Sequence, residues 1–138
     1  MSSLPLDRAS ASARWMVRTG VVLSALPILM MAVSSAMKFV HPPEFLEQWT
    51  THFGYLRSSL IPIAVVELAS ATLYAIPRTA VLGAILSTGY LGGAIATHVR
   101  LGEPAFLGGL ILGILVWAGL YLRDERIRRL IPLRQDRS

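Results

Sequence analysis

Four long apolar stretches run along this chain, separated by short segments that carry charges or prolines. Each stretch has about the 20 residues that an α-helix needs to cross the roughly 30 Å hydrocarbon layer of a bilayer. The stretches lie at about residues 16–39, 58–76, 79–99 and 105–122. The pattern therefore predicts an all-α integral membrane protein, folded as a four-helix bundle.

Polar segments flank the predicted bundle, which occupies residues 15–123. Residues 1–14 are rich in Ser and Ala and are expected to form a mobile tail, and residues 124–138 form a basic tail. Arg14 and Arg18 before the first apolar run could imitate a secretory signal. Because this run is longer than a usual signal core, we expect a retained first helix.

A more polar segment follows the first span, at residues 41–57. Within it, apolar residues recur at helical spacing: Phe45, Leu46, Trp49 and Phe53. This spacing predicts a short amphipathic helix that lies on the membrane surface or caps the bundle.

Positive charge gathers near both ends of the chain, whose formal net charge is +5. The two terminal segments and Arg78 hold ten of the thirteen Lys and Arg residues, and the other two loops hold Lys38, Arg57 and Arg100. Because cytoplasmic loops are enriched in Lys and Arg, we predict that both termini are cytoplasmic. Most of the remaining surface must face lipid, so we expect contact with lipid headgroups and none with nucleic acid.

The chain has no cysteine, which excludes disulfides, thiol redox chemistry and cysteine-ligated clusters. Its three histidines offer no pair on facing spans for the two axial ligands of a membrane haem. The sequence has no Gly-rich phosphate loop and no Ser-His-Asp set. We therefore expect no metal and no intrinsic cofactor.

Glu67 is the sharpest candidate for chemistry, because it lies ten residues after Arg57 and eleven before Arg78. A charged side chain facing lipid at this depth would cost roughly 2.5 to 3.5 kcal/mol. We therefore expect Glu67 to point into the bundle. It could act there as a proton carrier, a general acid or base or a ligand anchor, or it could form a structural hydrogen bond between helices.

Basic side chains lie at the outer ends of two spans: Lys38 on the first, and His98 and Arg100 on the third. With Glu67 below them, they are expected to line a polar pocket that opens outward. Glu67 lies roughly 15 Å below the level of Arg57. A direct pair therefore requires Lys38 to reach inward, and a ligand or water could sit between the two. Alternatively, Lys38 and Arg100 snorkel to the interface, and His98 forms a hydrogen bond there.

Tyr90 and Thr97 lie seven residues apart in the third span and share one face near the depth of Glu67. The phenol could hydrogen-bond the carboxylate or a ligand carbonyl, or it could be an aromatic packing residue with a satisfied hydroxyl. The candidate ligand-binding residues are therefore Lys38, Glu67, Tyr90, Thr97, His98 and Arg100.

Two pairs of glycines are spaced four residues apart, Gly89 with Gly93 and Gly109 with Gly113. Small residues at this spacing allow helix backbones to approach closely in a membrane. We expect these pairs to lie where helices pack.

Four strings of residues resemble the DoxX-like membrane proteins. They are SSAMKFVHPP at residues 34–43, GYLR at 54–57, VVELASATLYAIPRTAVLGAIL at 65–86 and GYLGGAIATHVRLGEP at 89–104. The resemblance covers about residues 15–132, and the polar residues in these strings include the same six candidates.

The resemblance implies a four-helix, multi-pass bundle in the bacterial cytoplasmic (inner) membrane. It also implies a loose link to redox biology, because the family's name comes from a subunit of a thiosulfate:quinone oxidoreductase. The absence of cysteine argues against thiol or thiosulfate chemistry on the residues of this chain itself.

Three functions stay open from the sequence, and so does the question of whether the chain is an enzyme. The first is a binding subunit for a quinone or another amphipathic molecule, which supports a redox partner. In it Glu67 carries a proton, Tyr90 and His98 donate hydrogen bonds, and Lys38 and Arg100 hold negative charge. The second is a stand-alone enzyme, such as an isomerase acting on a lipophilic substrate. The third is a scaffold or assembly protein. We also expect a homo-oligomer.

Overall fold

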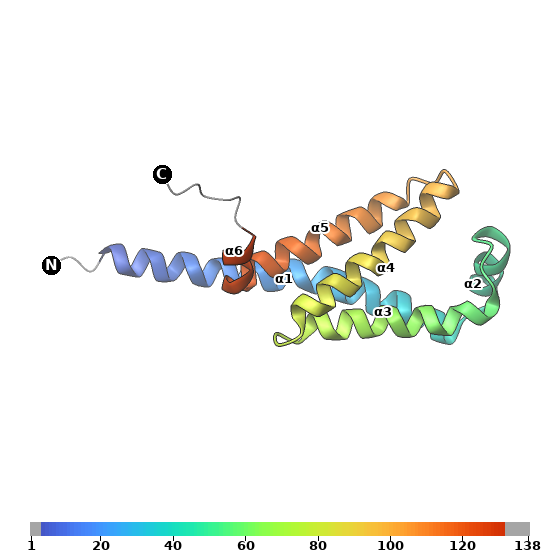
Figure 1. Ribbon diagram of the computed structural model, residues 1–138, viewed down its shortest axis with the longest axis horizontal. Coiled ribbons are helices and arrows are strands. Elements are labelled where there is room, and N and C mark those ends of the chain that lie inside the picture. The colour runs from blue at the N-terminus through green and yellow to red at the C-terminus, as the bar shows by residue number, and fades with distance from the viewer. Residues whose placement is uncertain (1–3, 132–138) are drawn as a thin grey trace.

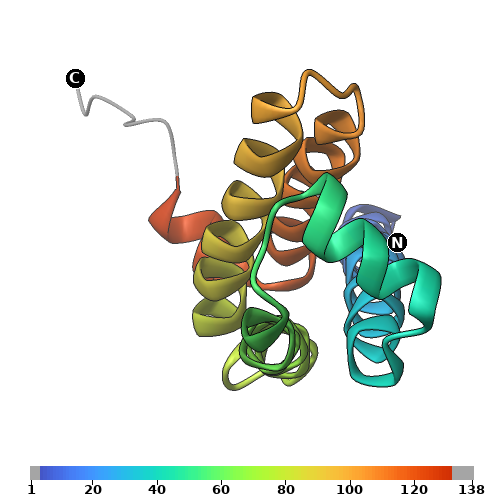
Figure 2. The ribbon, with the colours of Figure 1, turned by 90° about the vertical axis from the view of Figure 1, so that its right-hand side faces the viewer.

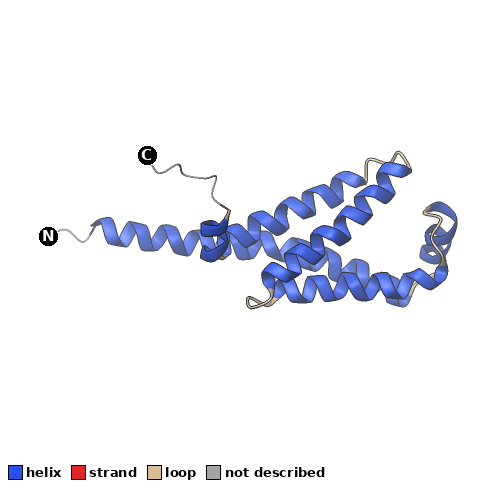
Figure 3. Ribbon diagram, viewed as in Figure 1, coloured by secondary structure: helices blue, strands red, loops and turns tan. Residues whose placement is uncertain are grey.

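The structure of the chain is a computed structural model, and it describes residues 4–131. Across these residues the regular structure is helical, with no strand (Figure 3). Four helices are long and apolar enough to cross a membrane: α1 (Leu4–Val40), α3 (Leu60–Ala75) with the turn Arg57–Ser59 before it, α4 (Ala80–Arg100) and α5 (Phe106–Arg123). The predicted all-α fold with four apolar helices is confirmed.

Short helices occupy both ends of the bundle. At one end, α2 (Pro43–Glu47) continues as a π-helical turn, Gln48–His52, before the chain enters α3. The loop between α4 and α5 lies at this same end, whereas α6 (Glu125–Leu130) and the α3–α4 turn lie toward the other (Figure 1). This arrangement is consistent with four helices that each cross the membrane once. Which end of the bundle faces the cytoplasm stays a prediction.

Helix α1 is much longer than a bilayer requires. Its 37 residues correspond to about 55 Å of helix, and its first turns extend beyond the other helices (Figure 1). Residues 4–14 of the expected tail are helical, and residues 1–3 lie outside the described residues, so the mobility of this segment stays a prediction. Ala, Leu and Arg are good helix formers, and adding turns to an existing helix needs no new nucleus.

The predicted basic tail begins with a sharp turn at Asp124. The Asp124 side chain accepts a hydrogen bond from the second backbone N–H of α6 at 2.9 Å and so caps that helix. Arg128 donates to the carbonyl of Leu122 at 2.6 Å, which satisfies an otherwise free group at the end of α5. The buried Ile127 joins the bundle core. Residues 132–138 of the tail lie outside the described residues.

The bundle turns small and polar residues inward and large apolar residues outward. The buried positions of α1 recur every three or four residues: Gly20, Ser24, Pro27, Met31, Ser35 and Lys38. Large apolar side chains such as Val22, Leu29 and Ile114 are exposed. This is the arrangement expected when the surrounding solvent is lipid, since only the helix contacts need small or polar groups.

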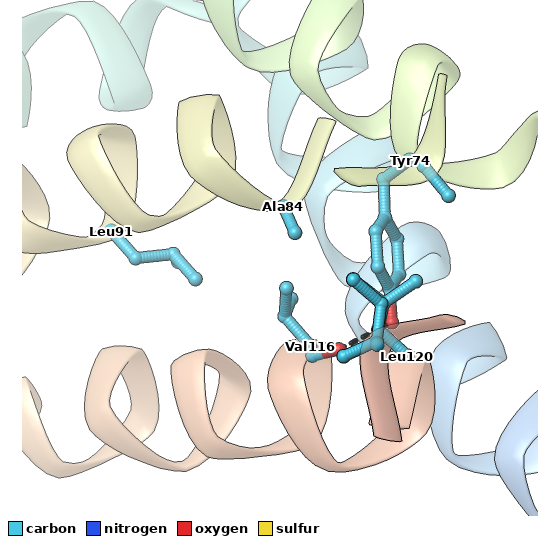
Figure 4. Close-up of a cluster of buried hydrophobic side chains, with 7 residues drawn as sticks. Tyr74, Ala84, Leu91, Val116 and Leu120 are labelled. Carbon is cyan, nitrogen blue, oxygen red and sulfur yellow. Dashed lines mark hydrogen bonds between the residues drawn. The ribbon is translucent and has the colours of Figure 1, made fainter. Parts of the chain in front are cut away.

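The apolar core lies in the half of the bundle near the α3–α4 turn. Tyr74, one of its buried residues, donates a hydrogen bond to the carbonyl of Val116 at 2.7 Å (Figure 4). The same hydroxyl lies 2.9 Å from Ser24 Oγ. Arg123 adds a hydrogen bond to the Tyr74 carbonyl at 2.7 Å and stacks over the ring. Tyr74 therefore joins α3 to α1 and α5.

The closest helix contacts in this half depend on residues without large side chains. A Cβ atom added at Gly119 would lie 2.4 Å from Ser24 Oγ and 3.1 Å from the Gly20 carbonyl oxygen, so α1 and α5 meet here. A Cβ at Gly83 would lie 2.1 Å from the backbone nitrogen of Tyr74, where α3 and α4 meet. These small residues allow the backbones to approach.

The glycine pairs that we expected at helix contacts are mostly elsewhere. A Cβ added at Gly89, Gly93 or Gly113 would meet nothing within 4 Å. Gly109 alone of the four is crowded, with Ile95 Cγ1 at 2.9 Å. The prediction is therefore wrong for three of the four, because spacing along a helix does not say which face a neighbouring helix covers.

Replacing Gly119 by Ala is expected to destabilise the bundle, because the new methyl group would collide with Ser24 and the backbone of α1. We expect a loss of about 1–3 kcal/mol in the free energy of unfolding, as for other overpacked contacts. Gly113→Ala, in the same helix, is the matched control and should be neutral or slightly stabilising, since Ala favours helices. Thermal unfolding in nanodiscs measures both. Equal stability of the two variants would contradict the packing described.

Candidate ligand-binding site

Lys38 of α1 and Glu67 of α3 form a direct ion pair in the interior. The Lys38 Nζ atom lies 2.8 Å from Glu67 Oε2, and the two residues are 5% and 1% exposed. Lys38 also donates to Ser34 Oγ at 2.7 Å and to the Tyr90 hydroxyl at 3.2 Å. The three donors of the ammonium group are thus used inside the protein, which offsets part of the cost of removing the charge from water.

This direct contact corrects two expectations for Lys38. The sequence leaves room for a ligand or water between Lys38 and Glu67, or for Lys38 to snorkel to the interface. Both are wrong, because Lys38 lies on the same buried face of α1 as Ser35 and Met31. Its long side chain therefore reaches the Glu67 carboxylate without leaving the bundle.

A cavity of about 420 Å³ lies beside this ion pair. Lys38, Ser34 and Tyr90 line it together with Thr97 and His98. Most of its other lining is apolar or aromatic: Phe45, Trp49, Phe53, Tyr55, Ile63, Gly89, Gly93 and Ala94. Its volume lies in the range of small-molecule sites, which typically combine apolar walls with a few placed polar groups.

A second, smaller cavity of about 190 Å³ lies on the other side of the same polar group. Glu67 lines this cavity and not the larger one, whereas Lys38 lines only the larger one. Ser34, Tyr90 and His98 line both. The ion pair and Tyr90 therefore separate two cavities.

Residues 43–56, which we call the cap, cross the end of the bundle between α1 and α3 (Figure 2). Trp49 is buried at the centre of the cap, stacks on Tyr55 with ring centroids 4.9 Å apart, and donates to the Leu56 carbonyl at 3.3 Å. Phe45 also stacks on Trp49, with ring centroids 6.1 Å apart. The segment predicted to be amphipathic thus packs its aromatic residues over the cavity. Of the two predicted positions, on the membrane surface or as a cap on the bundle, the structure shows the cap.

Side chains at the end of α4 hold the cap in place. The Glu103 carboxylate pairs through one oxygen with His98 Nδ1 at 2.7 Å and through the other with His52 of the cap. Thr97 hydrogen-bonds the Tyr55 hydroxyl, and Arg100 donates to the Phe53 carbonyl at 2.5 Å. Among the described residues, no group of three His, Asp or Glu side chains is placed to hold a metal ion.

The predicted site residues divide into three groups. Lys38, Glu67 and Tyr90 meet at the ion pair, and Thr97 and His98 line the same larger cavity. Arg100 does not reach either cavity. Its side chain is exposed and donates to a carbonyl of the neighbouring cap, so a role for Arg100 in ligand binding stays a prediction.

Several contributors were missed from the sequence: Ser34, Trp49, Tyr55 and Glu103. Ser34 precedes Lys38 by one helical turn, and Glu103 follows His98 by five residues, so both spacings were visible. Neither spacing shows which partner a side chain finds across the bundle. Tyr55 reaches Thr97 only because the cap folds back over α4.

The contact with Glu103 determines what His98 can offer a ligand. Because a carboxylate only accepts hydrogen bonds, His98 Nδ1 carries the proton between them. The other nitrogen, Nε2, makes no hydrogen bond within residues 4–131. In the neutral ring this nitrogen accepts a hydrogen bond, and in the protonated ring it donates one.

The sequence profile of the DoxX-like family matches residues 22–119. The chain belongs to the DoxX-like family. The match contains all six predicted site residues, the cap and Glu103. No curated protein and no solved structure matches this DoxX-like protein. Its four apolar helices make it a membrane protein, whereas the bacterial inner membrane and a homo-oligomer stay predictions.

Replacing Lys38 alone should be far more damaging than replacing the whole ion pair. Lys38→Met leaves the Glu67 carboxylate buried without a cation, and we expect the free energy of unfolding to fall by about 3–5 kcal/mol. Lys38→Met combined with Glu67→Leu should recover most of this loss, because an apolar pair of similar volume is often neutral. Thermal unfolding in nanodiscs measures both.

The exposed pair between Glu125 and Arg129 is the control for this comparison, with its atoms 2.7 Å apart. Arg129→Ala should leave the unfolding temperature unchanged, because exposed pairs contribute little. A double variant at Lys38 and Glu67 as unstable as Lys38→Met would show instead that the fold itself requires the charges.

The attachment of the cap is expected to weaken in acid. Hydrogen bonds from His98 and then His52 lower the pKa of Glu103 below its ordinary value of 4.5. A lowered pKa contributes stability that is present above pH 4.5 and is lost as the pH falls through the lower value in the folded state. The hydrogen-exchange protection factors of residues 48–56, which correct for the slower intrinsic exchange in acid, should therefore decrease at acid pH. Glu103→Gln should show fast exchange already at pH 7, and slow exchange in that variant would contradict the role given to Glu103.

Proposed function

We propose that this DoxX-like protein binds one small amphipathic molecule of the quinone type in its larger cavity and supports a membrane redox process as the binding subunit. The observation that carries the proposal is the buried group of Lys38, Glu67 and Tyr90 beside a cavity whose walls are otherwise mainly apolar. An apolar packing of these helices would not need a buried ion pair.

The cavity offers partners for both the ring and the oxygens of such a molecule. Aromatic side chains of the cap suit a planar ring through stacking or edge contacts. The Tyr90 hydroxyl accepts a hydrogen bond from Lys38 and also interacts with the Glu67 carboxylate, so a ligand carbonyl oxygen would take the Tyr90 proton in exchange for that carboxylate. His98 Nε2 can accept from a hydroxyl, which is the group that replaces the carbonyl after reduction.

The ion pair gives this site a way to handle protons. A bound quinone supplies the redox chemistry, since it takes up two electrons from the partner and two protons to become a quinol. The Lys38 ammonium stabilises negative charge that develops on an oxygen near Tyr90. Glu67 contacts Lys38 from the side of the smaller cavity and acts as the group that exchanges protons with that cavity.

The stand-alone isomerase is less well supported by this geometry. A general acid or base must come within hydrogen-bond reach of the reacting atom. Glu67 does not line the larger cavity, so it could act on a ligand there only through Lys38 or Tyr90. The scaffold alternative is supported by the exposed glycines on α4, which could contact a helix of another protein. Detection of a bound ligand would argue against it.

Native mass spectrometry with lipid extraction of the gently purified protein tests the proposal. We expect one quinone-type molecule to accompany the wild type and to be lost in Glu67→Gln. In titrations with menadione, followed by tryptophan fluorescence, Tyr90→Phe should weaken binding about three- to tenfold, the effect of losing one hydrogen bond.

Tyr121→Phe is the matched control, because Tyr121 is exposed on α5 and lines neither cavity. It should bind menadione as the wild type does. If only bulk phospholipid accompanies every form, and menadione binds to none, the proposal is wrong.

A further inference from the structure

The end of the bundle is a poor entrance to the larger cavity. The cap crosses this end, and the contacts of Glu103 and Arg100 described above hold it against α4 (Figure 2). The buried Trp49 fills the centre of the cap. A ligand arriving from water would therefore have to displace an aromatic cluster and several hydrogen bonds.

The side of the bundle between α3 and α4 is different. The two helices meet near their common turn, and α4 then runs obliquely away from α3 toward the end that carries the cap (Figure 1). Ile63 is the one α3 residue in the described lining of the larger cavity. Little of α3 therefore covers the cavity along this side.

Two glycines leave the α4 edge of this side open. Gly89 and Gly93 line the cavity and are themselves exposed, and a Cβ added at either would meet nothing within 4 Å. Every other residue in the described lining is buried or half-buried. The exposed part of the cavity wall therefore lies along Gly89 and Gly93.

The surface around this edge is apolar. Ile85 and Leu86 of α4 and Val66 of α3 are exposed large apolar residues, and both helices belong to the candidate membrane spans. An opening at this position therefore faces the hydrocarbon layer and not water.

We infer that the larger cavity opens sideways into the bilayer between α3 and α4, and that its ligand is a lipid-soluble molecule whose hydrocarbon tail lies across Gly89 and Gly93. This inference rests on the proposed function and adds the class of ligand. The polar head reaches Tyr90, which lies within one turn of both glycines along α4, and Lys38, which hydrogen-bonds Tyr90. The tail stays in the lipid. A tail-less molecule of the same ring type fits the cavity but gains nothing from the opening.

The test compares a tailed and a tail-less probe with the same naphthoquinone ring, menaquinone-4 and menadione. Both are titrated against the full chain in nanodiscs, with wild type, Gly89→Leu and Gly93→Leu. The ratio of menaquinone-4 affinity to menadione affinity should fall roughly tenfold in the variants, as expected if about two methylene groups lose their contacts. Using this ratio removes any effect of the leucine on the ring itself.

Gly92→Leu is the matched control, because Gly92 is exposed on α4, has the same free space around its Cβ position and lines neither cavity. Its affinity ratio should equal that of the wild type, and circular dichroism checks that all variants are folded. An unchanged ratio in both Gly89→Leu and Gly93→Leu would overturn the side opening while leaving binding itself intact. If neither probe binds the wild type, the proposed function fails and this inference fails with it.

Discussion

The structure depends on the pairing of two charges that the surrounding lipid cannot solvate. Lys38 and Glu67 lie on different helices and are almost completely buried, and their 2.8 Å contact offsets part of the cost of burying both charges. Ser34 and Tyr90 accept the remaining donors of Lys38. This group ties α1, α3 and α4 together at a point where the helices are otherwise separated by cavities.

The two ends of the bundle are built on different principles. Near the α3–α4 turn, Gly20, Gly83 and Gly119 bring the backbones together, and Tyr74 hydrogen-bonds across the contact. At the opposite end, helices diverge and aromatic residues of the cap cover the space between them. Close packing in one half therefore supports the other half, which contains the cavity.

The elements that could be predicted from the sequence are those governed by the bilayer alone. An apolar run of sufficient length must form a helix, because lipid offers no partner for backbone polar groups. The same reasoning placed Glu67 in the interior, since exposure to lipid would be costly. The amphipathic spacing of Phe45 and Trp49 likewise indicated a short helix after the first span, although it left open whether that helix lies on the membrane or caps the bundle.

The sequence by itself therefore determined the four apolar helices, the inward position of Glu67 and the polar residues available to a site. Only the tertiary structure decided which of them meet. It joined Lys38 directly to Glu67, turned Arg100 away to the cap, and placed Gly89 and Gly93 beside a cavity instead of a helix contact. The physical reason is that hydropathy and spacing report depth and face along one helix. The partner of each face depends on how the helices cross, and that is set by packing among residues distant in the chain.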